Sequence, residues 1–378
     1  MKSLSFYNAH IISPGVDRPD SRVDVDGGVI AGIAESTTGD MDIQGNYLVP
    51  GFVDIHTHGA GGASAMDGTE EAVRIMAETK LKEGVTSFCP TTWTESEESL
   101  VGAMSGIAAY MKRQEFARTP FVHIEGPYIN PDCIGAQNPA YVRPPDMVEI
   151  DHLNNIAKVG IVSLAVEMAG GIEFVRAATQ RGIVTSLAHT AATYAQFLQA
   201  KDAGAKHLTH FCNQMTKLHH REIGLVGAGL LDDEIRLEMI CDKIHLSPEM
   251  IALTFKHKPV EQIMLITDSI SASWLPDGEY EEGGQKIRVA DGVCRLESGA
   301  LAGSTLRYDR GLKHVAEITG KPLSELIQTT SWNQVQSLGL GKFGKIESGF
   351  AADFVVLDRE SLAPVATIVG GEMRFEAG

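Results

Sequence analysis

Short apolar runs alternate with amphipathic stretches from about residue 50 of the chain onward. Two of the amphipathic stretches, residues 69–82 and 193–203, have the spacing of helices that bury one face. Eight apolar runs of strand length lie along the same region: 52–55, 85–89, 121–124, 161–166, 183–188, 207–209, 237–241 and 263–266. Eight successive strand–helix repeats predict an α/β protein built on a (β/α)8 TIM-type barrel.

The two ends of the chain show a different pattern. Residues 1–49 contain short strand-like segments separated by turns such as Pro14-Gly15, without a helical period. The tail from Lys345 is again rich in strand-like segments, for example 354–357. We expect residues 1–49 and 345–378 to form one small β-sandwich domain, with the barrel over residues 50–344. A β-hairpin is predicted at 285–296, turning at Asp291-Gly292.

Histidines and carboxylates stand at the ends of five of the apolar runs. Side chains two residues apart share one face of a strand, so His56 and His58 present two imidazoles together. Active sites of (β/α)8 barrels lie at the carboxyl ends of the strands, where these residues would meet. The predicted site therefore contains His56, His58, Glu125, His189, His210 and Asp268.

Imidazole and carboxylate ligands suit a divalent transition metal: zinc first, with iron, cobalt, nickel or manganese as alternatives. One or two metals per subunit fit the number of ligands. A catalytic metal lowers the pKa of a water molecule, and a neighbouring carboxylate can take the proton and return it to the leaving group. Asp268 is the candidate for this general base, so the predicted activity is metal-assisted hydrolysis of an amide or related bond.

The composition and charge of the chain limit its possible binding partners and its cellular compartment. The formal net charge of −17 argues against nucleic acid and anionic membrane surfaces, both of which need a basic footprint. No apolar stretch reaches 18 residues, and the first residues lack the apolar core of a signal peptide. The five cysteines form no CxxC pair, so we expect a reducing, cytoplasmic protein that acts on a small molecule.

Several segments together resemble the N-acetylglucosamine-6-phosphate deacetylase family of the amidohydrolase superfamily. They are PGFVDIHTHG (50–59), HIEGPY (123–128), LAHT (187–190), LTHFCNQM (208–215), ITD (266–268) and LAGS (301–304). The resemblance extends over essentially the whole chain. It implies hydrolysis of the acetamido group of N-acetylglucosamine 6-phosphate, giving glucosamine 6-phosphate and acetate.

The resemblance also implies roles for individual residues. Glu125, His189 and His210 would hold the principal metal, and His56 with His58 would hold a second one, with Glu125 as a bridge. Asp268 would be the general base and then the acid toward the sugar amine. The substrate phosphate would be bound by the guanidinium group of Arg221. Further donors would come from Asn213, Gln214 and His245. A homodimer is implied, with phosphate contacts that cross the interface.

Two departures from the family pattern leave the substrate open. Gln137 stands where the family usually has a histidine that polarises the acyl carbonyl, and Gln214 replaces a usual alanine beside the phosphate pocket. The Gln137 amide can still donate a hydrogen bond to the substrate, although it cannot be cationic. The alternatives are N-acetylgalactosamine 6-phosphate or another N-acyl-hexosamine 6-phosphate, a different amidohydrolase such as an N-acyl-amino-acid deacylase, or a catalytically silent barrel. The presence of all five ligands and the base argues against the last.

Overall fold

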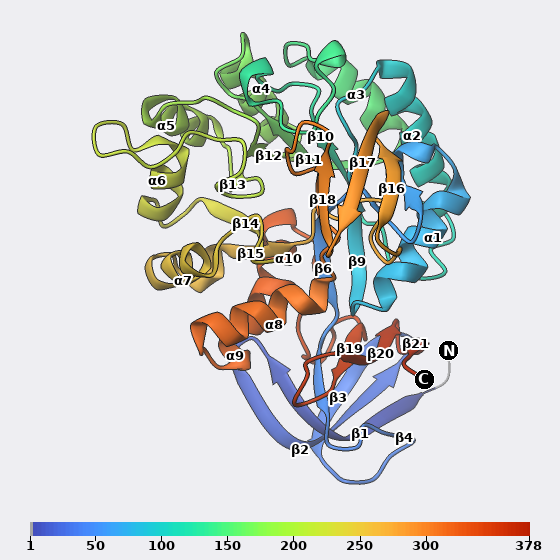
Figure 1. The fold of residues 1–378 in the computed structure, drawn as a ribbon. Helices are drawn as coiled ribbons and strands as arrows, with labels where there is room; N and C mark the ends of the chain where they lie inside the picture. Colours follow the sequence, from blue (N-terminus) through green and yellow to red (C-terminus); the bar gives the residue numbers. More distant parts are fainter. Residues whose placement is uncertain (1–2) are drawn as a thin grey trace.

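The computed structural model describes residues 3–378, and its centre is a curled sheet of parallel strands surrounded by helices (Figure 1). The strands are β6 (Phe52–Thr57), β9 (Val85–Pro90), β10 (Val122–Glu125), β11 (Val159–Leu164), β12 (Val184–Leu187), β13 (His207–Leu208), β14 (Arg236–Ile240) and β15 (Ile263–Ile266). Each overlaps one of the apolar runs, so the predicted strand positions are confirmed. The strands are buried on both faces, which explains why the sequence shows apolar runs rather than alternation.

The pairing of these strands follows chain order. Strands β10 to β15 form one parallel sheet, and β6 pairs with β9, also in parallel. Isolated parallel bridges continue the series at both edges: Thr91 with His123, and Thr57 with Ser269. The carboxyl ends of strands that are distant in the sequence therefore lie at one edge of the sheet.

Helices follow most of the strands and cover the outside of the sheet (Figure 1). Thr69 begins the first helix by accepting a hydrogen bond from the Ala72 amide, and Thr193 forms a capping box with Gln196. The predicted helices at 69–82 and 193–203 are thus observed. The helices are α1 (Glu70–Leu81), α2 (Glu97–Met111), α3 (Met147–Ile156), α4 (Gly171–Gln180), α5 (Tyr194–Ala203), α6 (Gly224–Leu231), α7 (Pro248–His257), α8 (Tyr308–Thr319), α9 (Leu323–Leu326) and α10 (Trp332–Leu338).

A second, mixed sheet is built from both ends of the chain and lies at the bottom of Figure 1. Its strands are β1 (Leu4–Ser13), β2 (Val16–Asp26), β3 (Val29–Glu35), β4 (Met41–Asp42), β5 (Tyr47–Pro50), β19 (Phe354–Leu357), β20 (Pro364–Val369) and β21 (Glu372–Glu376). Strand β19 pairs antiparallel with β5, so the tail returns to the first 50 residues as the sequence predicts. Phe6, Val23 and Phe354 belong to its separate apolar core.

The chain between β15 and α8 forms a small antiparallel sheet in front of the central one (Figure 1). Its strands are β16 (Gly278–Glu282), β17 (Gln285–Ala290) and β18 (Val293–Leu296). Ala290 pairs with Val293 across Asp291-Gly292, and both turn residues have positive φ, 53° and 72°. This is the predicted hairpin with its two-residue turn. Among residues 3–378, no helix has both the length and the apolarity to cross a bilayer.

Candidate metal centre and active site

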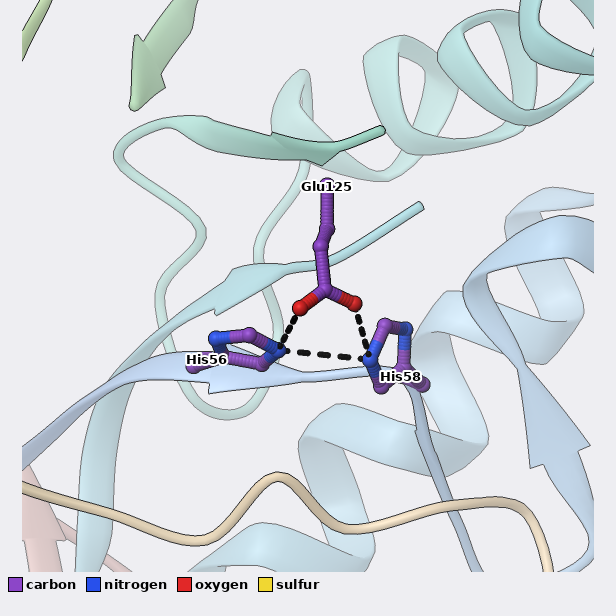
Figure 2. A group of neighbouring side chains, drawn as sticks. All are labelled: His56, His58 and Glu125. Carbon is purple, nitrogen blue, oxygen red and sulfur yellow. Dashed lines mark hydrogen bonds and ion pairs between the residues drawn. The ribbon is translucent and has the colours of Figure 1, made fainter. Parts of the chain in front are cut away.

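Two histidines and one carboxylate meet where β6 and β10 end (Figure 2). His56 Nε2 lies 3.5 Å from Glu125 Oε1, and His58 Nε2 lies 3.2 Å from Glu125 Oε2. After Glu125 the chain turns at Gly126, whose φ is 68° and where a Cβ would lie 2.0 Å from Thr94 Oγ1. Only glycine fits that close approach. The ligand-type atoms of His56, His58 and Glu125 all lie within 4.8 Å of one another, so they can share one cation.

Glu125 belongs to a second group of the same kind, with the histidines that follow β12 and β13. His210 Nε2 lies 3.1 Å from Glu125 Oε1 and 3.2 Å from His189 Nε2. His189 Nε2 is 3.6 Å from the same carboxylate oxygen. This group also fits within 4.8 Å. The structure therefore brings all five predicted ligands together, in two groups that share one buried carboxylate.

The donor set fits a divalent transition metal. His56 Nε2 and His58 Nε2 face each other at 3.3 Å, as do His189 Nε2 and His210 Nε2 at 3.2 Å. Backbone carbonyls accept from the opposite nitrogens of two rings: Thr91 O lies 3.2 Å from His58 Nδ1, and Cys133 O lies 2.8 Å from His189 Nδ1. These contacts hold the proton on Nδ1 and leave the Nε2 lone pairs directed at the shared space, as in known metal sites.

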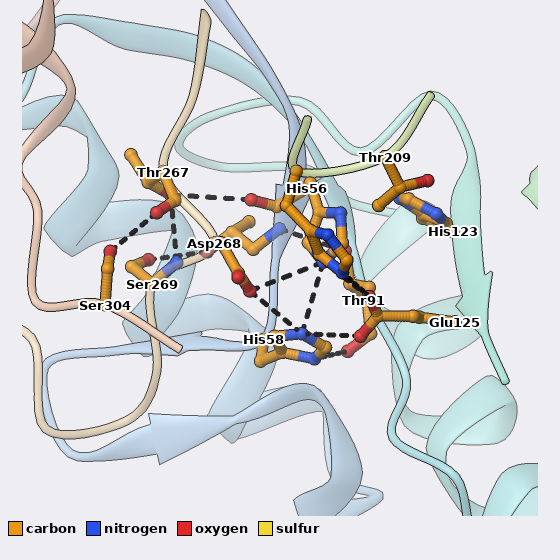
Figure 3. A network of polar contacts seen from close by, with 12 residues as sticks. His56, His58, Thr91, His123, Glu125, Thr209, Thr267, Asp268, Ser269 and Ser304 are labelled. Atoms are coloured by element: carbon orange, nitrogen blue, oxygen red, sulfur yellow. Dashed lines mark hydrogen bonds and ion pairs between the residues drawn. The ribbon is translucent and has the colours of Figure 1, made fainter. Parts of the chain in front are cut away.

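Asp268 follows β15 and completes this side of the site (Figure 3). Its Oδ1 lies 3.2 Å from His58 Nε2 and 3.4 Å from His56 Nε2. Burial raises the pKa of Asp268, but the neighbouring His56 and His58 outweigh burial and hold the pKa below its usual value. Burial lowers the pKa of His58, yet Asp268 and Glu125 raise it to about 9, so a metal that binds Nε2 has to displace a proton from this ring. Positive charge beside Asp268, from the rings or from a bound cation, holds it as a carboxylate, the form that accepts a proton.

The residues that flank Asp268 are fixed by a buried lysine. Lys80 of α1 has no exposed surface, and its Nζ donates to Thr267 Oγ1 at 3.1 Å and to Ser269 Oγ at 2.9 Å. The same ammonium group pairs with Asp54 of β6 at 3.1 Å. Lys80 thus ties the end of β15 to β6, the strand that carries the first two histidines.

Three of the candidate ligand and base residues have strained backbones. His189, His210 and Asp268 have φ values of 44°, 31° and 51°, in the left-handed region that residues other than glycine rarely adopt. All three come directly after or close behind a strand end, where the chain turns out of the sheet. Such strain is typical of functional sites, where the surrounding structure fixes the side chain in one direction.

A cavity of about 190 Å³ opens onto this cluster. Four of the predicted substrate-binding residues line it: Gln137, Asn213, Gln214 and His245. A larger concavity of about 810 Å³ lies along β16–β18, and none of the predicted metal ligands lines it. The smaller cavity is where the chemistry of the predicted site can act.

Gln137 is almost completely buried, and both ends of its amide are used within the chain. Its Nε2 donates to Glu125 Oε2 at 2.7 Å, and its Oε1 accepts from the Thr94 amide at 2.7 Å. The amide nitrogen that was expected to donate to a substrate carbonyl therefore donates to Glu125, the carboxylate common to the two groups. In this arrangement Gln137 orients Glu125 between the two groups.

Three of the four predicted phosphate-binding residues line the cavity, and Arg221 does not. Asn213 lines the cavity while its amide donates to the His210 carbonyl at 3.1 Å, and the exposed Gln214 lies beside it with a φ of 47°. Burial lowers the pKa of His245, but a 2.6 Å contact with Asp242 outweighs it and raises the pKa. Arg221 is exposed and is absent from the cavity lining; its Nη1 donates to His220 Nε2 at 2.7 Å. The structure does not bring Arg221 to the cavity of its own chain.

Three further residues in or next to the site were not identified from the sequence. Trp93 stacks on His58, with ring centroids 4.2 Å apart, and lines the cavity. Lys80 and Glu238 are buried charges close to the ligands. One signal was present for Glu238, because it is an acidic residue inside the apolar run 237–241. A carboxylate in a doubly buried strand has to find a polar partner.

Comparison with known proteins shows the family of the chain. The model of the amidohydrolase family matches residues 47–374. The chain belongs to the amidohydrolase family. Within it, the chain is 35% identical over 339 residues to an N-acetylglucosamine-6-phosphate deacetylase of Lysinibacillus sphaericus, covering 89% of this chain and 87% of the relative. It is 36% identical over 343 residues to an N-acetylgalactosamine-6-phosphate deacetylase of Escherichia coli O157:H7, covering 90% and 91%.

Solved structures of deacetylases are similar to this chain over nearly its whole length. The N-acetylglucosamine-6-phosphate deacetylase of Thermotoga maritima is 36% identical and superposes with a TM-score of 0.90, covering 99% of this chain and 100% of that chain. A mutant of the Mycobacterium smegmatis enzyme in complex with N-acetyl-D-glucosamine-6-phosphate is 27% identical, with a TM-score of 0.93 and coverage of 99% and 100%. These relatives fix the mixed α/β fold and the class of hydrolytic enzyme.

Proposed function

We propose that this enzyme hydrolyses the acetamido group of N-acetylglucosamine 6-phosphate to glucosamine 6-phosphate and acetate. The observation that carries the proposal is the pair of His/Glu groups that share Glu125, with Asp268 beside them, at one cavity that Glu125 and Asp268 both line. Relatives that carry the name of this activity cover nearly the whole chain.

The sugar epimer is a second, specific alternative. Relatives named for N-acetylglucosamine 6-phosphate and for N-acetylgalactosamine 6-phosphate are almost equally similar, at 35% and 36% identity. A single contact to the 4-hydroxyl group could separate the two sugars. A deacylase for N-acyl amino acids and a silent barrel remain the weaker alternatives, because neither explains the phosphate-directed residues together with a complete set of ligands and base.

In the proposed mechanism, Glu125, His189 and His210 would hold the principal metal, and His56, His58 and Glu125 would hold a second one. Zinc is the first choice, with iron, cobalt, nickel or manganese as the others. When bound, the metal activates a water molecule and polarises the acyl carbonyl. The Asp268 carboxylate accepts a proton from water as the water oxygen bonds to the acyl carbon. Asp268 then donates this proton to the sugar nitrogen as the carbon–nitrogen bond breaks, which leaves acetate and the free amine.

We also propose how the two parts of the fold are organised and in which compartment the protein acts. The parallel bridges at both edges of the central sheet support closure into a (β/α)8 barrel over residues 50–344. The bond from the Ile30 amide to the Phe350 carbonyl, at 2.8 Å, brings β3 next to the segment before β19 and supports a sandwich-like second domain from residues 1–49 and 345–378. The cysteines of the described chain are all free, which supports a reducing, cytoplasmic environment.

We further propose a homodimer in which Arg221 reaches the cavity of the partner subunit. Arg221→Ala should then raise KM for the 6-phosphorylated sugar by about 10–100-fold, since a hydrogen bond to a charged group contributes about 1.5–3 kcal/mol. KM for the unphosphorylated sugar should change little. Steady-state kinetics on both sugars measures the difference, with Arg113→Ala as the charge-matched control, because Arg113 is an exposed arginine just after α2 that lies beside Glu70.

The cross-subunit arrangement has its own test. Mixed dimers of Arg221→Ala and Asp268→Asn subunits contain one cavity with an intact base and an arginine supplied by the other subunit. Such mixtures should recover activity that neither variant has alone at low substrate concentration. Equal damage to both sugars, without recovery on mixing, would instead identify Arg221 as a structural residue of its loop.

Gln137 should influence turnover through Glu125. Gln137→Ala removes the 2.7 Å hydrogen bond to Glu125 and should lower kcat/KM by about 10²-fold or somewhat less. Gln137→His places a donor that can be cationic at the same point, so turnover should rise or the preference between the two epimers should shift. Kinetics on both N-acetylhexosamine 6-phosphates provides the measurement. Unchanged values in both variants would remove Gln137 from the site.

The substrate assignment is tested by acetate release from four sugars: N-acetylglucosamine and N-acetylgalactosamine, each with and without the 6-phosphate. We expect kcat/KM to be highest for N-acetylglucosamine 6-phosphate and to fall when the phosphate is absent. A higher value for the galactose epimer would reassign the substrate within the same reaction. Equal values with and without phosphate would contradict the proposed phosphate recognition.

A further inference from the structure

A buried carboxylate that the proposed mechanism does not use lies within the curled sheet, close to the metal ligands. Glu238 of β14 has no exposed surface. Its Oε1 accepts from His207 Nδ1 at 2.8 Å and from Ser186 Oγ at 3.3 Å. Its Oε2 has no hydrogen-bond partner among the described residues. A buried carboxylate oxygen without a donor is costly, so a partner is expected for it.

The group that faces this oxygen is the ring of His56. His56 Nδ1 lies 3.7 Å from Glu238 Oε2, and it too has no hydrogen-bond partner in residues 3–378. On the other side of the same ring, Nε2 is directed at the cluster in Figure 2, 3.5 Å from Glu125 Oε1. His56 is thus placed between a shared metal ligand and a carboxylate, with one ring nitrogen facing each.

The neighbouring histidines cannot serve Oε2 in place of His56. His123 packs edge-on against His56, with ring centroids 4.6 Å apart, but its Nδ1 bonds to the Ile55 carbonyl at 2.9 Å and its Nε2 to Ser163 Oγ at 2.7 Å. His207 uses Nδ1 for Glu238 Oε1 and Nε2 for a hydroxyl of α10. Both rings have their two nitrogens engaged, which leaves the His56 ring to Oε2.

We infer that Glu238 is a positioning residue for the second metal, one that accepts the Nδ1 proton of His56 and keeps its Nε2 free to bind the metal. The inference deepens the two-metal site of the proposed function and rests on it. The 3.7 Å separation exceeds a hydrogen bond by about 0.5 Å, which a small movement of either side chain can close. His58 and His189 are held by neutral carbonyls, whereas His56 would be held by a carboxylate, which makes its ring the more basic ligand.

Titration of the metal-free protein with Co²⁺ tests this role without reference to activity. The visible absorption of Co²⁺ bound to histidine and carboxylate reports each binding step, and the wild-type protein should take up two ions per subunit. Glu238→Gln should bind the first ion with wild-type affinity and the second about 10–100-fold more weakly. A glutamine side chain has only one acceptor oxygen, so it cannot accept from both His207 Nδ1 and His56 Nδ1 as the two carboxylate oxygens can.

A matched control separates positioning from general damage to the interior. Ser186→Ala removes a hydrogen bond to Oε1 of the same carboxylate and leaves Oε2 facing His56. It should bind both Co²⁺ ions within about twofold of wild type, since no metal ligand loses a contact. Equal weakening in the two variants, or two unchanged affinities in Glu238→Gln, would overturn the inference while leaving the proposed function intact.

The number of Co²⁺ ions that the wild-type protein binds is a second test of the inference. A wild-type chain that binds one ion overturns the inference but not a one-metal deacetylase, and a chain that binds none overturns both. If Glu238→Gln does not fold, a crystal structure of the zinc-loaded wild-type protein decides: His56 Nδ1 and Glu238 Oε2 should lie within about 3.2 Å. A gap that remains as wide as the present 3.7 Å with zinc on His56 would contradict the inference.

Discussion

Asp268→Asn should lower kcat by about 10²–10⁴-fold while the protein still folds and binds its metal. The amide that replaces the carboxylate cannot accept the proton of the attacking water. Asp268 lies 3.2 Å from His58 Nε2, at the edge of the metal groups rather than inside them, so the ligand set stays complete. Turnover of N-acetylglucosamine 6-phosphate by the metal-loaded variant measures the loss.

Metal content and a control variant show whether the loss of turnover comes from the missing base. The metal content of Asp268→Asn should equal that of the wild-type protein, which separates loss of the base from loss of the metal. Asp151→Asn, at an exposed ion pair with Arg181, changes the same functional group far from the site and should leave kcat unchanged. A kcat for Asp268→Asn within a few-fold of wild type would remove Asp268 from the role of general base.

Glu125→Gln should lose both metals together, because one carboxylate serves both groups. Glu125 Oε1 lies 3.1 Å from His210 Nε2 and Oε2 lies 3.2 Å from His58 Nε2. Metal content should fall below one ion per subunit, and turnover should drop by about 10³-fold or more, since a catalytic metal contributes several kcal/mol. Elemental analysis with parallel kinetics provides the measurement.

The matched control for Glu125→Gln is Glu173→Gln, at an exposed position in the first turn of α4. It should keep both the metal content and the activity of wild type. Independent loss of only one metal in Glu125→Gln would contradict the shared carboxylate and would indicate that the remaining group binds through its histidines alone.

The positions of the central strands could be predicted because strands buried on both faces leave continuous apolar runs. The grouping of the five candidate ligands with Asp268 could be predicted for a related reason. Each interrupts the apolar pattern at the end of such a run, and the fold brings those ends to one edge. The turn at Asp291-Gly292 was also visible, because both residues tolerate the positive φ that the hairpin needs.

The partners of individual side chains could not be predicted. Gln137 lies in a segment without periodicity, and nothing in the sequence indicates that its amide bonds to Glu125 and to the Thr94 backbone. The acidic side chain of Glu238 indicates only that it needs a polar partner. The bond from His207 and the 3.7 Å approach of His56 Nδ1 depend on how the strands lie in three dimensions. Arg221 stands on an exposed loop, and its role in the proposed homodimer depends on contacts with a second chain.

Release of acetate from N-acetylglucosamine 6-phosphate, measured with and without metal, tests the central claim most directly. The metal-loaded protein should form acetate and glucosamine 6-phosphate in equal amounts. Activity should disappear when a chelator removes the metal and return when Zn²⁺ is added. Absence of acetate from both this sugar and its galactose epimer, or turnover that is the same in the metal-free protein, would contradict the account.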